Sequence, residues 1–247
     1  MPAKTILITG ASSGIGAALA RGYAAPGVTL LLWGRDGARL EAVAGDCRTK
    51  GAEIRTQVFD LRDGAGFAGL LSAAPAIDIA IFNAGLGGTA PDDAAAEVPG
   101  TAQAIADVNF TAPIVGANAI APAMAARGAG HIVLVGSITE SFPLPMAPTY
   151  AATKAGLKMF AEAFSIRMEK HGVMVTLVSP GFIDTPMSQS VTEPKPFLMR
   201  AEDAAAIIIR KIEAGARTIV VPWQFAVVRC IANLLPRALL RGILSRT

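Results

Sequence analysis

The sequence predicts an α/β fold in which one domain is built on a doubly wound parallel sheet and followed by a C-terminal helical extension. Short β-branched runs alternate with longer alanine-rich stretches along the 247 residues. Most runs are apolar at consecutive positions, as strands covered by helices on both faces require. The length suits a single large domain, and no internal repeat or linker divides the chain.

Each predicted element follows from this alternation. The expected strands are Thr5–Thr9, Thr29–Trp33, Glu53–Phe59, Ile77–Phe82, His131–Val135, Val173–Ser179 and Thr218–Val221. Between them, Ile15–Ala25, Ala102–Ala126 and Tyr150–His171 are long enough to be crossover helices. We therefore expect residues 1–222 to form the main domain and residues 223–247 to form the extension.

The composition is that of a globular protein with an uneven charge. Hydrophobic residues make up 52% of the chain and charged residues 17%, which excludes a disordered chain. From Ala214 onward there are five arginines and no acids, so this segment carries a charge of +5. Because the net charge of the chain is +3, the residues before it carry −2. The body has neither a basic cluster nor a nucleic-acid-reading module, so we expect no nucleic-acid partner.

The remaining compositional signals indicate a cytoplasmic protein without a metal. Met1–Thr9 runs almost directly into a strand and has no leader pattern, which argues against secretion. Cys47 and Cys230 have no metal-site spacing, so we interpret them as idle thiols in a reducing compartment. His131 and His171 flank predicted elements and are expected at turns or on the surface. No uncharged apolar stretch is expected to reach the ~20 residues that span a bilayer.

A glycine-rich loop, Thr9-Gly10-Ala11-Ser12-Ser13-Gly14-Ile15-Gly16, joins the first strand to the first helix. Its glycines permit a tight turn and a close approach of the backbone to a pyrophosphate, which would rest on the helix N-terminus. The loop thus predicts the phosphate cradle of a Rossmann-type fold. Taken alone, it could also be a plain tight turn between a strand and a helix.

The loop resembles the T-G-x-x-x-G-x-G element of the short-chain dehydrogenase/reductase family, and other family motifs follow in the family's order. They are Asn83-Ala84-Gly85 after the fourth strand, Asn109 in the next helix, Ser137 after the fifth strand, Tyr150-x-x-x-Lys154, and Pro180-Gly181 after the sixth strand. Any one of these motifs recurs by chance. Their joint order and spacing indicate the single-domain branch of this family.

The resemblance implies an NADP(H)-dependent oxidoreductase that passes a hydride between the nicotinamide and a small-molecule carbonyl or alcohol. Its catalytic residues would be Asn109, Ser137, Tyr150 and Lys154. Tyr150 and Lys154, four apart on a helix, share one face, and a nearby ammonium favours the phenolate of a tyrosine. By resemblance, Ser137 polarises the substrate oxygen, Tyr150 exchanges its proton, and Asn109 anchors a water that relays protons to Lys154.

The predicted cofactor site extends from the glycine loop across the strand ends. Its residues are Gly10, Ser12, Ser13, Gly14, Ile15, Gly16, Arg35, Arg39, Asp60, Leu61, Asn83, Ala84, Gly85, Tyr150, Lys154, Pro180, Gly181, Ile183 and Thr185. NAD-preferring members place an acid where this chain has Gly34, and a guanidinium such as that of Arg35 can clamp a 2′-phosphate. NADP(H) is therefore favoured over NAD(H). Asp36 would take the acidic role instead if the second strand ended later.

The expected substrate pocket is mostly apolar. It combines Ile138, Phe142, Leu144 and Met146 after Ser137 with Phe182, Met187, Phe197, Leu198 and Met199 in a lid after Pro180. Pockets with such linings suit hydrophobic ligands, so we expect a lipophilic substrate. The alternative is that these side chains only pack the lid onto the body.

The tail has apolar residues at helical spacing on both sides of a proline. These are Val227, Val228, Ile231, Leu234 and Leu235 before Pro236, and Leu239, Leu240, Ile243 and Leu244 after it. With interspersed arginines, the tail is predicted to form two short basic amphipathic helices. They could bind an anionic membrane surface peripherally, or pack on the body or on a second subunit. The resemblance implies a homodimer or homotetramer.

Two other functions are compatible with parts of this pattern. An NADP-binding sensor or regulator could share the fold, although such proteins usually lack the Tyr/Lys pair found here. An epimerase or dehydratase of the family's extended branch could use similar residues, but it generally has a larger C-terminal substrate region. The sequence identifies neither the substrate nor the direction of the reaction.

Overall fold

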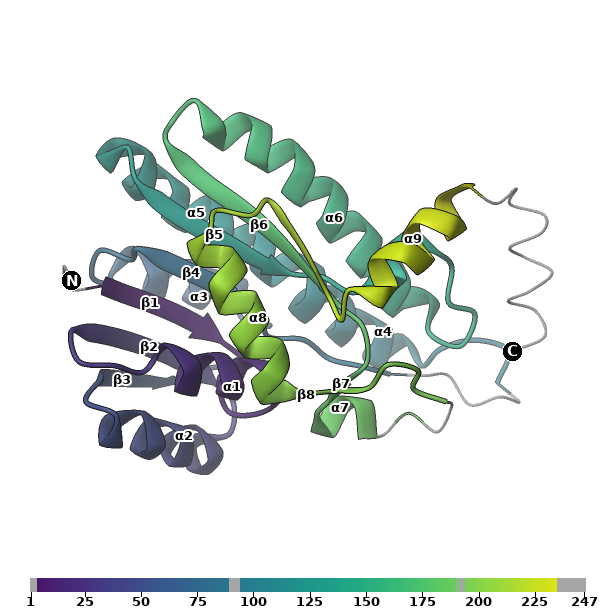
Figure 1. Cartoon of the computed structure of the whole chain (residues 1–247), viewed down its shortest axis with the longest axis horizontal. Helices are drawn as coiled ribbons and strands as arrows, with labels where there is room; N and C mark the ends of the chain where they lie inside the picture. Colours follow the sequence, from purple (N-terminus) through teal and green to yellow (C-terminus); the bar gives the residue numbers. More distant parts are fainter. Residues whose placement is uncertain (1–3, 89–93, 190, 192–193, 235–247) are drawn as a thin grey trace.

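A computed structural model describes residues 4–88, 94–189, 191 and 194–234 and has the predicted α/β architecture (Figure 1). Its centre is a 7-stranded parallel sheet in the order β3-β2-β1-β4-β5-β6-β9. The strands are β1 (Lys4–Thr9), β2 (Val28–Gly34), β3 (Glu53–Val58), β4 (Ile79–Phe82), β5 (Gly130–Val135), β6 (Val173–Pro180) and β9 (Thr218–Val221). All seven predicted strands are confirmed to within a few residues at each end.

The strand order places a topological switch beside β1. The chain moves from β1 to β2 and β3 on one side, and then returns to β4 on the other side. Thr5 is in register with Thr29 of β2, and Ile6 with Ile79 of β4. In open sheets of this kind, ligands bind beyond the carboxyl ends of the strands at the switch point. Every predicted motif that follows a strand therefore reaches this one edge.

Helices cover both faces of the sheet, which explains the continuously apolar strands (Figure 1). The buried residues of α1 (Gly14–Tyr23), α2 (Gly37–Thr49) and α8 (Ala201–Glu213) form one core layer with Ile6 and Ile8 of β1. Those of α3 (Gly64–Ser72), α5 (Ala112–Arg127) and α6 (Pro148–Glu169) form the other layer with Leu7. Successive side chains of a strand point to opposite faces, so each strand supplies both layers.

The helix expected at Ala102–Ala126 is longer than predicted and includes a wide turn. It consists of α4 (Pro99–Ala106), a π-helical turn (Asp107–Thr111) and α5. The combined helix Pro99–Arg127 is long and apolar enough to cross a membrane by length and composition alone, contrary to our expectation for the sequence. Half of its apolar window is buried inside the protein, where α5 packs between α3 and α6.

A second small sheet joins the two ends of the segment that follows β6. β7 (Ile183–Asp184) pairs in parallel with β8 (Met199–Arg200), and the short helix α7 (Pro186–Gln189) lies between them in sequence. After β9, helix α9 (Gln224–Leu234) agrees with the first of the two helices predicted for the tail. Residues 235–247, which include the second predicted helix, lie outside the described residues.

The expectation that His131 lies at a turn or on the surface is wrong. It lies within β5 and is 4% exposed, and its Nε2 is 2.7 Å from Thr176 Oγ1 on the neighbouring strand β6. That hydroxyl donates to the Ala216 carbonyl at 2.6 Å, so the imidazole Nε2–H is assigned as donor to it. The neutral imidazole is satisfied by this chain of hydrogen bonds. His171 is exposed, as expected.

This burial makes the stability of the protein sensitive to mild acid. Burial lowers the pKa of His131 from 6.5 to about 4, so below pH 6.5 the unfolded chain takes up a proton that the folded chain excludes. Stability is retained above pH 6.5 and falls as the pH approaches 4, by about 2–3 kcal/mol for this group. We expect His131→Gln to remove that part of the loss in denaturant titrations at pH 7 and 4.5. An equal reduction in His171→Gln would contradict this assignment.

Candidate active site

The glycine loop is packed tightly against the end of β4. Gly10 adopts a left-handed φ of 68°, and a Cβ there would lie 2.7 Å from the Ala84 Cα. A Cβ at Gly16 would lie 2.3 Å from the Gly10 carbonyl oxygen. The Asn83 amide donates to the Thr9 carbonyl at 3.1 Å, and the Thr9 hydroxyl accepts the backbone N–H groups of Asn83 and Ala84, each at 3.1 Å. Only glycines fit this close backbone approach.

The loop opens α1 in the geometry of an anion site. Ser13 is the extended residue that precedes the helix, and its side chain makes no capping hydrogen bond. The first turn of α1 contains no acid, so the positive end of the helix is not neutralised within the turn. The glycine backbone and the uncapped helix end have the shape and polarity that the binding of a pyrophosphate at Gly10, Gly14 and Gly16 would need.

β2 ends in glycine, and an arginine follows it. β2 ends at Gly34, where an added Cβ would lie 3.2 Å from the Ser12 hydroxyl, and Arg35 follows with an exposed side chain. Asp36 instead caps α2 by accepting the Arg39 N–H at 3.0 Å, and it pairs with the Arg39 guanidinium at 2.6 Å. Asp36 is therefore committed to the helix start, and Arg39 is less free for a ligand than the sequence suggested.

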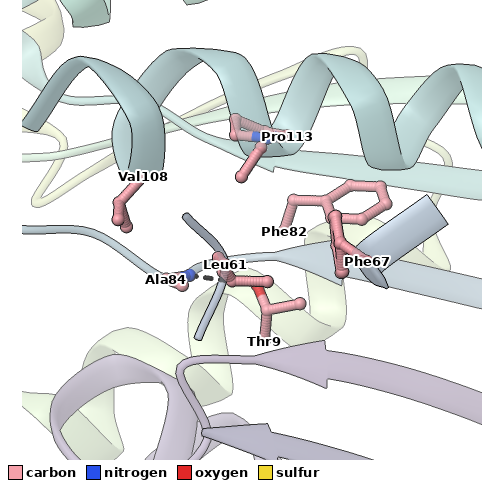
Figure 2. A pocket seen from close by; sticks show the side chains of 8 residues that line it. Thr9, Leu61, Phe67, Phe82, Ala84, Val108 and Pro113 are labelled. Atoms are coloured by element: carbon pink, nitrogen blue, oxygen red, sulfur yellow. Dashed lines mark hydrogen bonds between the residues drawn. The ribbon is translucent and has the colours of Figure 1, made fainter. Parts of the chain in front are cut away.

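Asp60 and Leu61 lie beside this edge after β3. The Asp60 carboxylate accepts hydrogen bonds from the Arg62 guanidinium at 2.5–3.1 Å, and these bonds, with a smaller contribution from Arg35, lower its pKa to about 2. Leu61 borders a narrow hollow between the sheet edge and the start of α5 (Figure 2). Its lining is Thr9, Leu61, Phe67, Phe82, Ala84, Val108, Ala112 and Pro113. Val108 was not predicted as part of the site, although it precedes Asn109.

Ser137 and Tyr150 meet as predicted. Ser137 follows β5 in extended conformation, is 7% exposed, and accepts the Thr139 N–H at 3.2 Å. Its hydroxyl hydrogen-bonds the Tyr150 phenol, which favours the phenolate. Burial outweighs this bond and raises the pKa of Tyr150, and the charge of Glu140 raises it further. Tyr150 is therefore a neutral phenol at neutral pH.

Lys154 lies one helical turn beyond Tyr150 on α6 and is 4% exposed. Its ammonium is 5.7 Å from the centre of the Tyr150 ring and donates to the Val135 carbonyl at 2.9 Å. Burial lowers the pKa of Lys154 from 10.5 to about 8. A buried lysine held by one carbonyl close to a phenol can both influence that phenol and exchange a proton near neutral pH.

Asn109 lies in the π-helical turn and is 1% exposed. Its side-chain amide bonds both polar groups of the Leu86 backbone: its Oδ1 accepts the N–H at 2.7 Å and its Nδ2 donates to the carbonyl at 2.9 Å. A Cβ at Gly85 would lie 3.4 Å from Asn109 Oδ1 and 3.9 Å from Lys154 Nζ. Gly85, Asn109 and Lys154 therefore border the same small volume, where the proposed water between Asn109 and Lys154 would lie.

The segment after β6 approaches the glycine loop again. The Gly181 N–H donates to the Val221 carbonyl at 2.8 Å, and Ile183 is buried in β7. A Cβ at Gly14 would lie 3.1 Å from the Thr185 side chain. Thr185 and the glycine loop thus lie side by side, as predicted for two parts of one cofactor site.

Several predicted pocket residues gather around an aromatic side chain that the sequence did not single out. Phe225 of α9 is 5% exposed, and its ring contacts those of Phe182 and Phe197 with centroid distances of 6.1 and 5.6 Å. Ile138 and Phe142 belong to the same apolar cluster. Met187 packs elsewhere, against Gly87 after β4. Met146 is half-buried and is not among the members of this cluster.

The start of α6, which carries Tyr150, is capped from a distant loop. Ala147 precedes the helix and has no capping side chain. Glu97 takes over this role, because its carboxylate accepts the Thr149 N–H at 3.1 Å and also the Thr149 hydroxyl. No sequence motif predicts this contact, which joins residues 52 positions apart.

We expect Glu97→Ala to lower the free energy of unfolding by about 1 kcal/mol, the usual loss for an N-cap. Turnover should also decrease, since Thr149 adjoins Tyr150. Glu97→Gln, which keeps an acceptor, should lose less of both. Denaturant titration and steady-state kinetics measure these effects, and equal losses in the two variants would contradict the capping role.

Other candidate chemistry is not found in the described part of the chain. Among those residues, no group of three or more His, Cys, Asp or Glu side chains could hold a metal ion. Cys47 is buried in the core and Cys230 is exposed on α9, and both are free thiols. The polar residues of the site therefore consist of the Ser137, Tyr150, Lys154 and Asn109 group and the buried Glu140 beside it.

Comparison with known proteins finds relatives that match most of the chain. The short chain dehydrogenase family profile matches residues 4–196. An uncharacterized oxidoreductase of Myxococcus xanthus is 32% identical over 244 residues, which are 97% of this chain and 95% of that protein. Dehydrogenase/reductase SDR family member 7B of Bos taurus is 33% identical over 195 residues, covering 74% of this chain and 59% of the longer relative.

Solved structures extend the match to the whole fold. A short-chain dehydrogenase from Sphingobium yanoikuyae in complex with NADPH superimposes with a TM-score of 0.83 at 26% identity, covering 99% of this chain and 96% of that one. A bulky-bulky ketone specific alcohol dehydrogenase from Comamonas testosteroni gives 0.80 at 26% identity, covering 95% and 96%. With the glycine cradle and the Ser137–Tyr150–Lys154 arrangement in place, these matches establish that the chain belongs to the short-chain dehydrogenase/reductase family of oxidoreductases.

Proposed function

We propose that this oxidoreductase uses NADP(H) to interconvert a bulky lipophilic ketone and its secondary alcohol. The observation that carries the proposal is the meeting of the Ser137 hydroxyl, the Tyr150 phenol and the buried Lys154 ammonium at the carboxyl edge of the sheet. The nicotinamide, when bound, supplies or accepts the hydride.

The side chains supply the proton chemistry of the reaction. In reduction, Ser137 donates a hydrogen bond to the substrate oxygen, and Tyr150 transfers its phenolic proton to the same oxygen as negative charge develops there. The raised pKa of Tyr150 keeps the phenol protonated for this step. Lys154, with its pKa lowered to about 8, then returns a proton to Tyr150, and Asn109 would anchor the water that links Lys154 to solvent.

The preference for NADP(H) rests on Arg35, Gly34 and Ser12. Gly34 stands at the position where an acid would repel a 2′-phosphate, and the Arg35 side chain lies exposed at the strand end. NADPH in the Sphingobium relative supports this assignment. The remaining predicted contacts, from the glycine loop to Thr185, would hold the pyrophosphate and the nicotinamide.

The preference for a bulky lipophilic substrate rests on the apolar cluster around Phe225, which includes Ile138, Phe142 and Phe182. The bulky ketone specificity in the name of the Comamonas relative supports the same class. Next in sequence to members of this cluster, the Thr139 and Ser141 hydroxyls and the Gln224 side-chain oxygen are buried without a hydrogen-bond partner among the described residues. A ketone with a bulky apolar body and one polar substituent fits both features.

A panel of ketones and aldehydes tests the proposal through NADPH consumption. We expect aryl and long-chain ketones to have much higher kcat/KM than small polar carbonyls, and Phe225→Ala to reduce that difference. A preference for small polar carbonyls would overturn the substrate class. Binding of NADPH without turnover of any compound would favour the alternative of an NADP-binding sensor.

Helix α9 is where we propose contact with a second subunit. Trp223, Val227, Val228 and Ile231 expose apolar surface there, between 40% and 68% of each residue. Docking of this basic tail on an anionic membrane of the cytoplasmic face is the alternative. Val227→Ser and Ile231→Ser should lower the oligomer mass if α9 contacts a second subunit, and deleting residues 236–247 should reduce co-sedimentation with anionic liposomes if the tail binds a membrane. Loss of neither property would contradict both.

A further inference from the structure

Glu140 is a buried carboxylate directly behind the catalytic residues. It lies in the 3₁₀ turn Ile138–Ser141 that follows Ser137, and its side chain is fully buried. The Ser179 hydroxyl at the end of β6 donates to its Oε1 at 2.7 Å. The Ser137 N–H donates weakly to its Oε2 at 3.4 Å, and Arg229 of α9 approaches Oε1 at 3.5 Å.

The turn needs a hydrogen-bond acceptor at this position but not a charged one. Removing a carboxylate from water is costly, and a well-packed apolar residue in its place is often neutral or stabilising. Two of the three contacts to Glu140 are long, and burial raises the pKa of its carboxyl group despite them. A charged group that is buried under these conditions acts mainly by shifting the pKa values of the neighbouring groups.

The charged and titratable neighbours of Glu140 come from two elements. Helix α6 supplies Tyr150, Lys154 and Lys158, and α9 supplies Arg229. The negative charge of Glu140 raises the pKa of Tyr150 and partly offsets the lowering of the pKa of Lys154 by burial. It thereby favours the neutral phenol and the charged ammonium.

We propose that Glu140 is a positioning residue of the catalytic centre, which holds the backbone of Ser137 and places a fixed negative charge behind Tyr150 and Lys154. It closes a capping box, in which Ser137 bonds the turn and Glu140 bonds the Ser137 N–H. The Ser137 hydroxyl is thereby presented toward Tyr150. The catalytic meaning of this arrangement rests on the proposed function, but the effect of the charge on Tyr150 does not.

The chain allows a direct test without any substrate, because it contains only two tyrosines. Burial raises the pKa of both Tyr23 and Tyr150, so each ring is followed by its own signal. NMR of protein labelled with ¹³C at tyrosine Cζ follows both rings separately. The Tyr150→Phe variant assigns the two signals.

We expect the Tyr150 titration to move to lower pH in Glu140→Gln, which keeps the shape and an acceptor but removes the charge. Glu169→Gln is the matched control: it changes the net charge equally at the far end of α6, where Glu169 is exposed and pairs with Arg217 at 2.6 Å. The control should leave the titration unchanged. An unchanged titration in Glu140→Gln, or an equal shift in both variants, would overturn the proposal.

A second measurement keeps the test valid if Glu140→Gln does not fold. In the wild type, the Tyr150 signal should show an earlier small step as Glu140 ionises, above the usual range of a carboxyl group. Ser179→Ala removes a bond that lowers the pKa of Glu140, so this step should move to higher pH. Absence of the step, or its failure to move, would contradict the assigned contact. Failure of the proposed substrate class would leave both titrations as predicted.

Discussion

Replacing Tyr150 with phenylalanine is expected to lower kcat by about 10²–10⁴-fold, the usual contribution of a positioned general acid or base. The substitution removes only the hydroxyl that hydrogen-bonds Ser137 and transfers the proton. The ring and its packing beside Lys154 remain, so the fold and nucleotide binding should be retained. Steady-state turnover on the best ketone of the panel and fluorescence titration with NADPH measure the two properties.

Tyr23→Phe is the matched control for this experiment. Tyr23 lies at the end of α1, is 6% exposed and has a hydroxyl without a hydrogen-bond partner among the described residues. Removing that hydroxyl should leave kcat near the wild-type value. A comparable loss of activity in both variants, or normal turnover in Tyr150→Phe, would mean that Tyr150 is not the proton donor.

Replacing Arg35 with alanine is expected to weaken NADPH binding by about 10–100-fold and to leave NADH binding nearly unchanged. This range corresponds to the ~1.5–3 kcal/mol of a hydrogen bond to a charged group. NADH lacks the 2′-phosphate and therefore loses no such bond. Parallel titration with the two nucleotides gives the ratio of dissociation constants directly.

Arg39→Ala is the corresponding control on the same surface. The Arg39 guanidinium already pairs with Asp36 at 2.6 Å, so its removal should affect NADPH binding less than removal of Arg35. A larger loss in Arg39→Ala would assign the phosphate to Arg39 instead. An equal loss of NADPH and NADH affinity in Arg35→Ala would contradict a contact to the 2′-phosphate.

The fold could be predicted from the sequence because its signals are local. Each buried strand, such as β1 with Ile6, Leu7 and Ile8, appears as a short apolar run, and the glycine loop follows directly in sequence. The same apolar runs show where each strand ends, and therefore where Ser137 and Gly181 lie. Once the sheet is parallel, its topology brings these residues to one edge.

The features that were missed depend on partners distant in sequence. His131 is buried because Thr176, on the adjacent strand, accepts its hydrogen bond. Phe225 joins the apolar cluster of Ile138 and Phe142 only because α9 returns to the turn after Ser137. In the sequence, Glu140 cannot be told from an exposed acid, because Ser179 and Arg229, which contact it, lie far along the chain. No local period or motif encodes such contacts.

The proposed reaction is the transfer of a hydride from NADPH to a ketone at the Tyr150 site. It can be followed directly by incubating the protein with a bulky ketone and NADPH deuterated at the transferred position of nicotinamide C4, and then measuring the mass of the alcohol formed. We expect an alcohol carrying one deuterium with the wild type and very little product with Tyr150→Phe. Bound NADPH without any labelled alcohol across the ketone panel would contradict hydride transfer by this protein.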